Sequence, residues 1–201
     1  MNVAAPADDR RLLVEAAIEI ASVRGFADTT AAMITERAGL EPATFGRIYD
    51  APEGCFFDAW DALRDCYLSA VEREAEDTDW LEQLRHLAHV STVFVAREPG
   101  RARLLASEIL ELGRPGRERL DALLDRLTVI VDRGRELAED PSKVPPITAQ
   151  GIVGGAHHRL VRVLRATERV APENLANELT SFAVAPYLGV EAASKELARP
   201  T

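Results

Sequence analysis

Apolar residues recur at helical spacing along the whole chain, and no segment shows the period-two alternation of a half-buried strand. A first helix is expected over about residues 8–24, where Gly25 is placed to end it. Further helices are expected at about 52–75, 80–97, 102–112, 120–137, 148–167 and 172–188. Residues 140–146 carry three prolines and are too proline-rich for a helix. With two short helices described below, the pattern predicts an all-α fold of roughly nine helices.

Two short helical segments lie between residues 25 and 56. Thr29 or Thr30 can cap the first, and Ala38-Gly39 ends it. Pro42 suits the first turn of the second, in which Phe45 and either Ile48 or Tyr49 face the core. A capped short helix, a tight break and a second short helix form the helix-turn-helix pattern, a motif that reads DNA.

The composition is that of a folded protein of one domain or two small ones. Of 201 residues, 47% are hydrophobic and 28% are charged, while only 5% are aromatic. No run of about 18 apolar residues exists, so no membrane span is expected. Residues 1–9 lack the basic and apolar regions of a signal peptide, which favours a cytoplasmic location.

The two cysteines are not expected to form a disulfide. If Cys55 and Cys66 lie on one helix, the helical rise separates them by about 16 Å. A disulfide requires Cα atoms within about 7 Å. We therefore expect two buried thiols.

The charge is unfavourable for contact with nucleic acid. The formal net charge is −9, and residues 1–50 hold five arginines against eight acids, a net of −3. Phosphate contacts dominate DNA affinity, so DNA-binding modules are usually basic. Placement of the charges matters, because only those within about a Debye length of the groove contribute much.

The order of these elements resembles the tetracycline-repressor (TetR) family of bacterial regulators. The match covers about the first quarter of the chain, and a tail at residues 185–189 also looks like members of this family. The resemblance implies a DNA-binding domain at residues 1–51 and a helical ligand-binding and dimerisation domain at 52–201. The matching residues are Ala16, Ala17, Gly25, Phe26, Thr29, Thr30, Ile34, Ala38, Gly39, Leu40, Thr44, Phe45, Tyr49, Glu53, Cys55 and Phe56.

Three positions depart from the pattern that the resemblance implies. The family usually has a phosphate-binding tyrosine at Gly46 and a phosphate-binding lysine at Pro52. It commonly has a small capping hydroxyl residue at Glu41, whose carboxylate is repelled by phosphate although it can accept from a cytosine amine. These departures lower the expected affinity for DNA and leave the fold prediction unchanged.

Five residues remain as candidates for DNA contact. Arg47 is the strongest, because a guanidinium can pair with guanine or hold a phosphate; the alternative is a solvated surface arginine. Thr44 either contacts a phosphate or a thymine methyl group, or packs within the motif. The complete set is Thr30, Pro42, Ala43, Thr44 and Arg47.

Small residues within 151–156 form a stripe on the predicted helix 148–167, where another backbone can approach closely. Together with a second stripe on the last helix they suit a four-helix interface across a two-fold axis; burial inside one subunit is the alternative. The predicted dimer residues are Val153, Ala156, Leu160, Leu164, Leu175, Leu179 and Phe182.

A ligand pocket is expected among the fourth to seventh helices and should be mostly apolar. Its candidate residues, which are alternatively ordinary core, are Trp60, Tyr67, Trp80, His86, Phe94 and Glu108. Glu82, His86 and His89 share one helix face, but no further ligands of matching spacing support a metal site.

These features predict a homodimeric transcription regulator, a repressor that a small apolar effector releases from a near-palindromic operator in double-stranded DNA. No nucleophile–base spacing or paired carboxylates indicate an enzyme, and no cofactor is expected. The alternative is a ligand- or protein-binding helical dimer that has the same fold and has largely lost operator binding.

Overall fold

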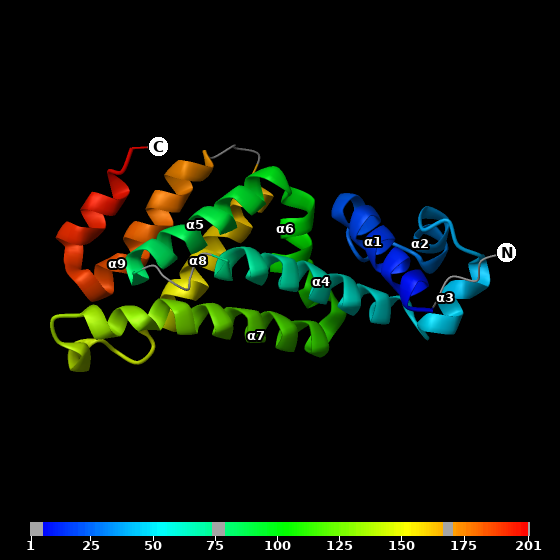
Figure 1. Ribbon diagram of the computed structural model, residues 1–201, viewed down its shortest axis with the longest axis horizontal. Coiled ribbons are helices and arrows are strands. Elements are labelled where there is room, and N and C mark those ends of the chain that lie inside the picture. The colour runs from blue at the N-terminus through cyan, green and yellow to red at the C-terminus, as the bar shows by residue number, and fades with distance from the viewer. Residues whose placement is uncertain (1–5, 74–78, 167–170, 201) are drawn as a thin grey trace. The chain divides into compact units, whose positions relative to one another are not determined.

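A computed structural model describes residues 6–73, 79–166 and 171–200. Over these ranges the chain forms nine α-helices, three short 3-10 helices and no strand, which confirms the all-α prediction (Figure 1). No helix in the described ranges is long and apolar enough to cross a membrane. The α-helices are α1 Pro6–Arg24, α2 Ala31–Arg37, α3 Pro42–Ile48, α4 Pro52–Glu72, α5 Trp80–Arg97, α6 Pro99–Ala106, α7 Gly113–Asp132, α8 Thr148–Arg165 and α9 Pro172–Leu197.

The sequence predictions were wrong in detail near the 3-10 helices. These are η1 Glu108–Leu112, η2 Arg133–Leu137 and η3 Pro141–Lys143. The helix expected over 102–112 is divided, because Ser107 leaves the helical conformation between α6 and η1. Likewise, the helix expected over 120–137 begins at Gly113 and gives way to η2. The predicted helix ends at residues 75 and 167 lie outside the described residues.

The last helix extends beyond the predicted end at residue 188. Gly189 has a φ of 83°, a left-handed conformation that glycine adopts without the usual cost, and helix resumes after this kink. Both cysteines lie on α4, and both are free thiols. Cys55 is buried, and burial raises the pKa of its thiol to about 12. The prediction that Cys66 is buried is wrong, because its side chain is exposed.

The chain divides into two compact units. The first comprises Met1–Cys66 and Gly100–Leu120, and the second comprises Tyr67–Pro99 and Asp121–Thr201. The first unit therefore holds α1 to α3, α4 as far as Cys66, α6 from Gly100, η1 and the start of α7. The predicted functional boundary after residue 51 stays a prediction.

In the first unit, α6 and η1 pack against the end of α1. A Cβ atom added to Gly100 would lie 2.1 Å from the carbonyl oxygen of Ser22, so α6 can approach α1 this closely only with glycine at that position. The Glu108 carboxylate accepts a hydrogen bond from the amide of Phe26 at 3.0 Å and forms an ion pair with Arg103. The Phe26 and Phe56 rings pack against each other in a tilted arrangement, with their centroids 4.7 Å apart.

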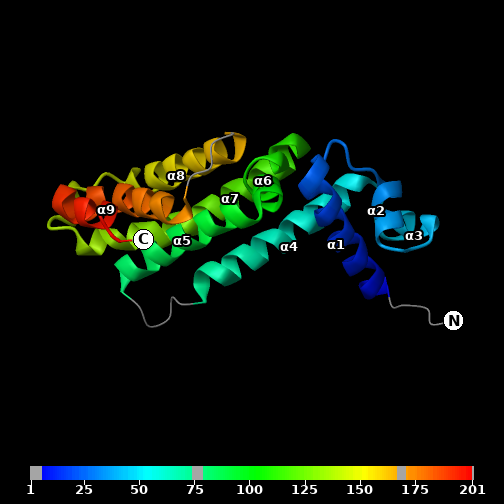
Figure 2. The same cartoon turned by 90° about the horizontal axis from the view of Figure 1, so that it is seen from above.

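In the second unit, α5, α8 and α9 lie side by side (Figure 2). Ala88 of α5 packs with Leu175, Ala176 and Leu179 of α9 in one buried cluster. The ring of Trp80 lies edge-on to Tyr187, and its Nε1 donates to the carbonyl of Ile130 at 3.1 Å.

A buried carboxylate joins the two ends of the second unit's sequence. Glu196 of α9 is only 7% exposed and accepts two hydrogen bonds from Arg85 of α5, at 2.7 and 2.8 Å. These bonds lower the pKa of Glu196 below its ordinary value. Arg85 also pairs with the exposed Glu82.

We expect Glu196→Gln to lower the free energy of unfolding at pH 7 by about 3 kcal/mol, because it leaves Arg85 without its buried counter-charge. A lowered folded-state pKa stabilises the fold above the unfolded-state pKa, near 4.5, and this contribution is lost as the pH falls through the folded-state value. In urea unfolding from pH 7 to pH 3, the free energies of unfolding of the native protein and of Glu196→Gln should converge. Glu178→Gln, which removes an exposed ion pair with Arg159, is the control and should cost less than about 1 kcal/mol. Equal losses in both variants would contradict the prediction.

Candidate nucleic-acid interface

The turn before α2 is built by two neighbouring threonines with different roles. Thr30 is exposed and caps α2, its hydroxyl accepting a hydrogen bond from the amide of Met33 at 3.3 Å. Thr29 is buried and donates to the carbonyl of Gly25 at 2.6 Å. The sequence left open which threonine is the cap, and the structure assigns that role to Thr30.

The break between α2 and α3 is held by a glycine in the left-handed region. Gly39 has a φ of 67°, and the amide of Leu40 donates back to the carbonyl of Thr35 at 3.1 Å. Pro42 then occupies the first turn of α3, where its missing amide costs little. Glu41 precedes the helix without a side-chain capping bond. The local geometry is therefore that of the predicted helix-turn-helix.

The outer face of α3 carries one guanidinium, that of Arg47. Pro42, Ala43, Gly46 and Arg47 are exposed, whereas Thr44 is only 2% exposed. Arg47 Nη2 donates to Thr44 Oγ1 at 2.7 Å, so the buried hydroxyl holds the exposed guanidinium in place. Of the two roles that the sequence left open for Thr44, its burial favours packing and positioning.

The space where the resemblance implies a tyrosine is empty. A Cβ atom at Gly46 would meet no atom within 4 Å. The backbone of α3 therefore admits a Cβ atom at this position without a close contact to the described residues.

Three of the five arginines within residues 1–50 are paired with carboxylates. Arg11 pairs with Glu15, and Arg37 pairs with Glu19 at 2.6 Å. Arg10 pairs with Asp58 at 2.7 Å. Within the described residues Arg47 has no ion pair, so the one cationic side chain of α3 is uncompensated.

No family model matches the chain, and no curated protein matches it. Several solved structures match over most of its length. A fatty acid degradation regulator, FadR from Bacillus halodurans, has a TM-score of 0.72 and 16% identity, covering 87% of this chain and 94% of its own. A TetR-like transcriptional regulator from Rhodococcus sp. RHA1 has a TM-score of 0.71 and 18% identity, with coverages of 88% and 94%.

A third match is AibR, solved with isovaleryl coenzyme A and operator DNA. It has a TM-score of 0.68 and 16% identity, covering 86% of this chain and 96% of its own. This chain has the TetR-family fold. At such low identity the likeness concerns the fold, and it confirms the fold that the sequence resemblance implied.

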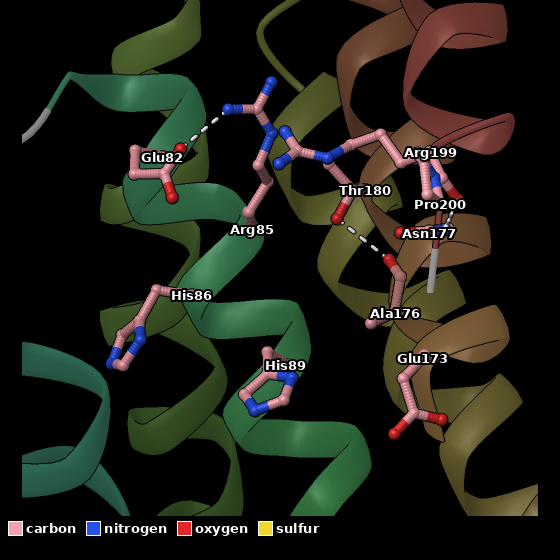
Figure 3. A pocket seen from close by; sticks show the side chains of 10 residues that line it. All are labelled: Glu82, Arg85, His86, His89, Glu173, Ala176, Asn177, Thr180, Arg199 and Pro200. Carbon is pink, nitrogen blue, oxygen red and sulfur yellow. Dashed lines mark hydrogen bonds and ion pairs between the residues drawn. The ribbon is translucent and has the colours of Figure 1, made fainter. Parts of the chain in front are cut away.

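Within this TetR fold, one cavity of about 360 Å³ lies in the second unit between α5 and α9. Its polar lining includes two arginines, two glutamates and two histidines. Figure 3 shows the guanidinium groups of Arg85 and Arg199 near one another, with Glu173 and His89 away from them. The lining residues are Glu82, Arg85, His86, His89, Glu173, Ala176, Asn177, Thr180, Arg199 and Pro200.

Among the six predicted pocket residues, His86 alone lines this cavity, and its ring lies 2.9 Å from the carbonyl of Ala70. Trp60 is fully buried and donates to the carbonyl of Leu105, and Glu108 makes the contacts described above. Tyr67 bonds to Ser91 and stacks on Phe94, while Trp80 packs on Tyr187. The described residues hold no cluster of three His, Cys, Asp or Glu suited to a metal ion.

The seven predicted dimer residues divide between core and surface. Val153, Leu175 and Leu179 are buried in the second unit, and Ala156 and Leu160 pack against the core cluster of α5 and α9. Leu164 is partly buried. Phe182 is 49% exposed, and its ring lies against Gly155, where a Cβ atom would approach it to 3.1 Å. Gly151 and Gly154 beside it are exposed with open space above them.

Proposed function

We propose that this chain is a transcription regulator that binds double-stranded DNA by placing α3 in the major groove. The observation that carries the proposal is the exposed, carboxylate-free guanidinium of Arg47 on the recognition helix. An arginine in this position can bind O6 and N7 of a guanine through two parallel hydrogen bonds. The exposed N-terminal residues of α3, Pro42 and Ala43, lie where recognition helices meet base edges.

We propose that the protein acts as a homodimer on a near-palindromic operator. The half-exposed Phe182 on α9, together with the open glycines Gly151 and Gly154 on α8, supports this assembly, because a second copy can approach such a surface closely. A two-fold dimer presents its recognition helices to half-sites about one helical turn, 34 Å, apart.

A small effector would release the DNA, which makes the protein a repressor in this proposal. Binding must favour one separation of the recognition helices over another, since a ligand shifts an equilibrium only by its differential affinity. The cavity between α5 and α9 supports an effector site. Its charged lining favours a polar effector, whereas the sequence predicted an apolar one.

The alternative function is a ligand- or protein-binding helical dimer that has largely lost operator recognition. Gly46 and Pro52 favour it, because neither side chain can bind a phosphate as the tyrosine and lysine implied by the resemblance would. The acidic balance of residues 1–50 favours it too.

Fluorescence anisotropy with DNA from the protein's own promoter region, at 50 to 200 mM salt, tests the proposal. We expect a specific complex that Arg47→Ala weakens by about 5- to 150-fold, the loss of one good base contact. No specific binding by the native protein at 50 mM salt would defeat the proposal.

The double variant Gly46→Tyr with Pro52→Lys distinguishes the two candidate functions in the same assay. If binding appears only in this variant, the native chain has lost its phosphate contacts and the alternative holds. If the native protein already binds its operator specifically, regulation by DNA binding is supported. Gly46 is exposed and a Cβ atom there meets no described atom within 4 Å, which makes the position suitable for the substitution.

The dimer surface has its own test. Phe182→Glu places a charge on the surface formed by α8 and α9, and we expect it to convert the dimer to a monomer in light scattering coupled to size-exclusion chromatography. Val129→Glu, which changes an exposed apolar residue on α7, is the matched control and should leave the mass unchanged. A dimer mass for Phe182→Glu at micromolar concentration would contradict this interface.

A further inference from the structure

Arg10, near the start of α1, reaches the C-terminal end of the recognition helix. Its guanidinium lies over the ring of Tyr49, 5.2 Å from the ring centroid, and Tyr49 is the C-cap residue directly after α3. Arg10 Nε donates to Asp58 Oδ2 on α4 at 2.7 Å, and Nη2 lies at the same distance from that oxygen. The side chain is nevertheless 55% exposed, so the cation is held at the surface.

The groups beneath Arg10 form a fixed support. The hydroxyl of Tyr49 donates to Asp58 Oδ2 at 2.6 Å, and the Tyr49 side chain is buried. Burial and the bond to Asp58 raise the pKa of Tyr49, so the hydroxyl stays protonated and continues to donate. A cation–π contact and a shared carboxylate oxygen therefore fix Arg10 against both α3 and α4.

Arg10 contacts Tyr49 and Asp58, which follow by three and six residues the two positions, Gly46 and Pro52, that lack a phosphate-binding side chain. Gly46 lies on α3, three residues before Tyr49, which is the extended residue directly after that helix. Pro52 opens α4, the helix that carries Asp58. Neither Gly46 nor Pro52 carries a cation, whereas Arg10 of α1 brings one to Tyr49 and Asp58 in the same two segments of the chain.

We propose that Arg10 is a phosphate-binding side chain of the DNA interface, presented from α1 at the end of the recognition helix. The inference rests on the proposed DNA binding and names a contact beyond the helix-turn-helix itself. A guanidinium has five N–H donors, and the bonds to Asp58 leave Nη1 available for a phosphodiester oxygen. The contact would be independent of sequence, because every nucleotide carries the same phosphate.

Asp58 sets the strength of this contact. Its carboxylate holds Arg10 in place and also compensates the charge that would attract the phosphate. Asp58→Asn keeps a polar partner for Tyr49 and removes the competing negative charge. We therefore expect Asp58→Asn to raise DNA affinity several-fold at low salt, the opposite direction to the loss of Arg10.

The deciding experiment measures affinity against salt concentration for the full-length protein, on operator DNA and on a scrambled duplex of equal length. Arg10→Gln should weaken binding to both duplexes by a similar factor, about 5- to 10-fold at 100 mM salt. It should also lower the slope of log affinity against log salt by about one, the signature of one lost phosphate contact. Arg10→Lys keeps the charge and should restore most of the slope.

Arg11→Gln is the matched control, because Arg11 is the neighbouring residue and pairs with Glu15 on the same helix. Its slope should equal that of the native protein. If Arg10→Gln and Arg11→Gln give equal slopes while the native protein binds its operator, the inference about Arg10 is wrong and the proposed function stands. If the native protein binds neither duplex, the proposed function itself fails. Circular dichroism of each variant, with the native helical signal expected, separates a lost contact from a lost fold.

Discussion

The carboxylate of Glu108 fixes the point from which the helix-turn-helix starts. It is 11% exposed and meets two donors, the amide of Phe26 just after α1 and the guanidinium of Arg103. A charge this deeply buried is tolerated only when hydrogen bonds replace the lost water. Gly25 completes the arrangement with a φ of 86°, and a Cβ atom there would lie 3.0 Å from the carboxylate. The turn that leads to α2 therefore depends on this contact together with the hydrogen bond that Thr29 donates to Gly25.

This dependence explains which parts of the fold the sequence could reveal. The cap at Thr30 and the break at Gly39 act over three to five residues, so their residue types indicate the motif directly. Glu108 and Phe26, which bond to each other, lie 82 residues apart in the sequence. The paired residues Arg85 and Glu196 lie 111 residues apart. No local pattern connects such pairs. The sequence accordingly predicts Glu108 as a ligand-pocket residue, since an acid in an apolar segment gives the same pattern in either role.

The sequence does not reveal the cavity between α5 and α9, because its lining residues are also far apart along the chain. Its charged residues come from one helix in the middle of the chain and another at its end, and each is unremarkable where it stands in the sequence. Apolar periodicity predicts α5 and α9, the helices that line the cavity, and it predicts α8 as well. It could not decide which apolar residues face the core, so Leu175 and Phe182 were grouped on one stripe, although one is buried and the other is half-exposed.

The ion pairs of the first unit bear on how an acidic module could recognise DNA. Exposed pairs such as Arg11 with Glu15 contribute little to stability, so exchanging a carboxylate for a phosphate costs little. The acids meanwhile weaken the attraction of every duplex, specific or not, because phosphate attraction is independent of sequence. The base contact proposed for Arg47 would act only where the right base is present. A DNA-binding domain with few uncompensated cations therefore has a lower affinity for all DNA but keeps the difference in affinity between its operator and other sequences. That difference determines where a regulator binds in a genome.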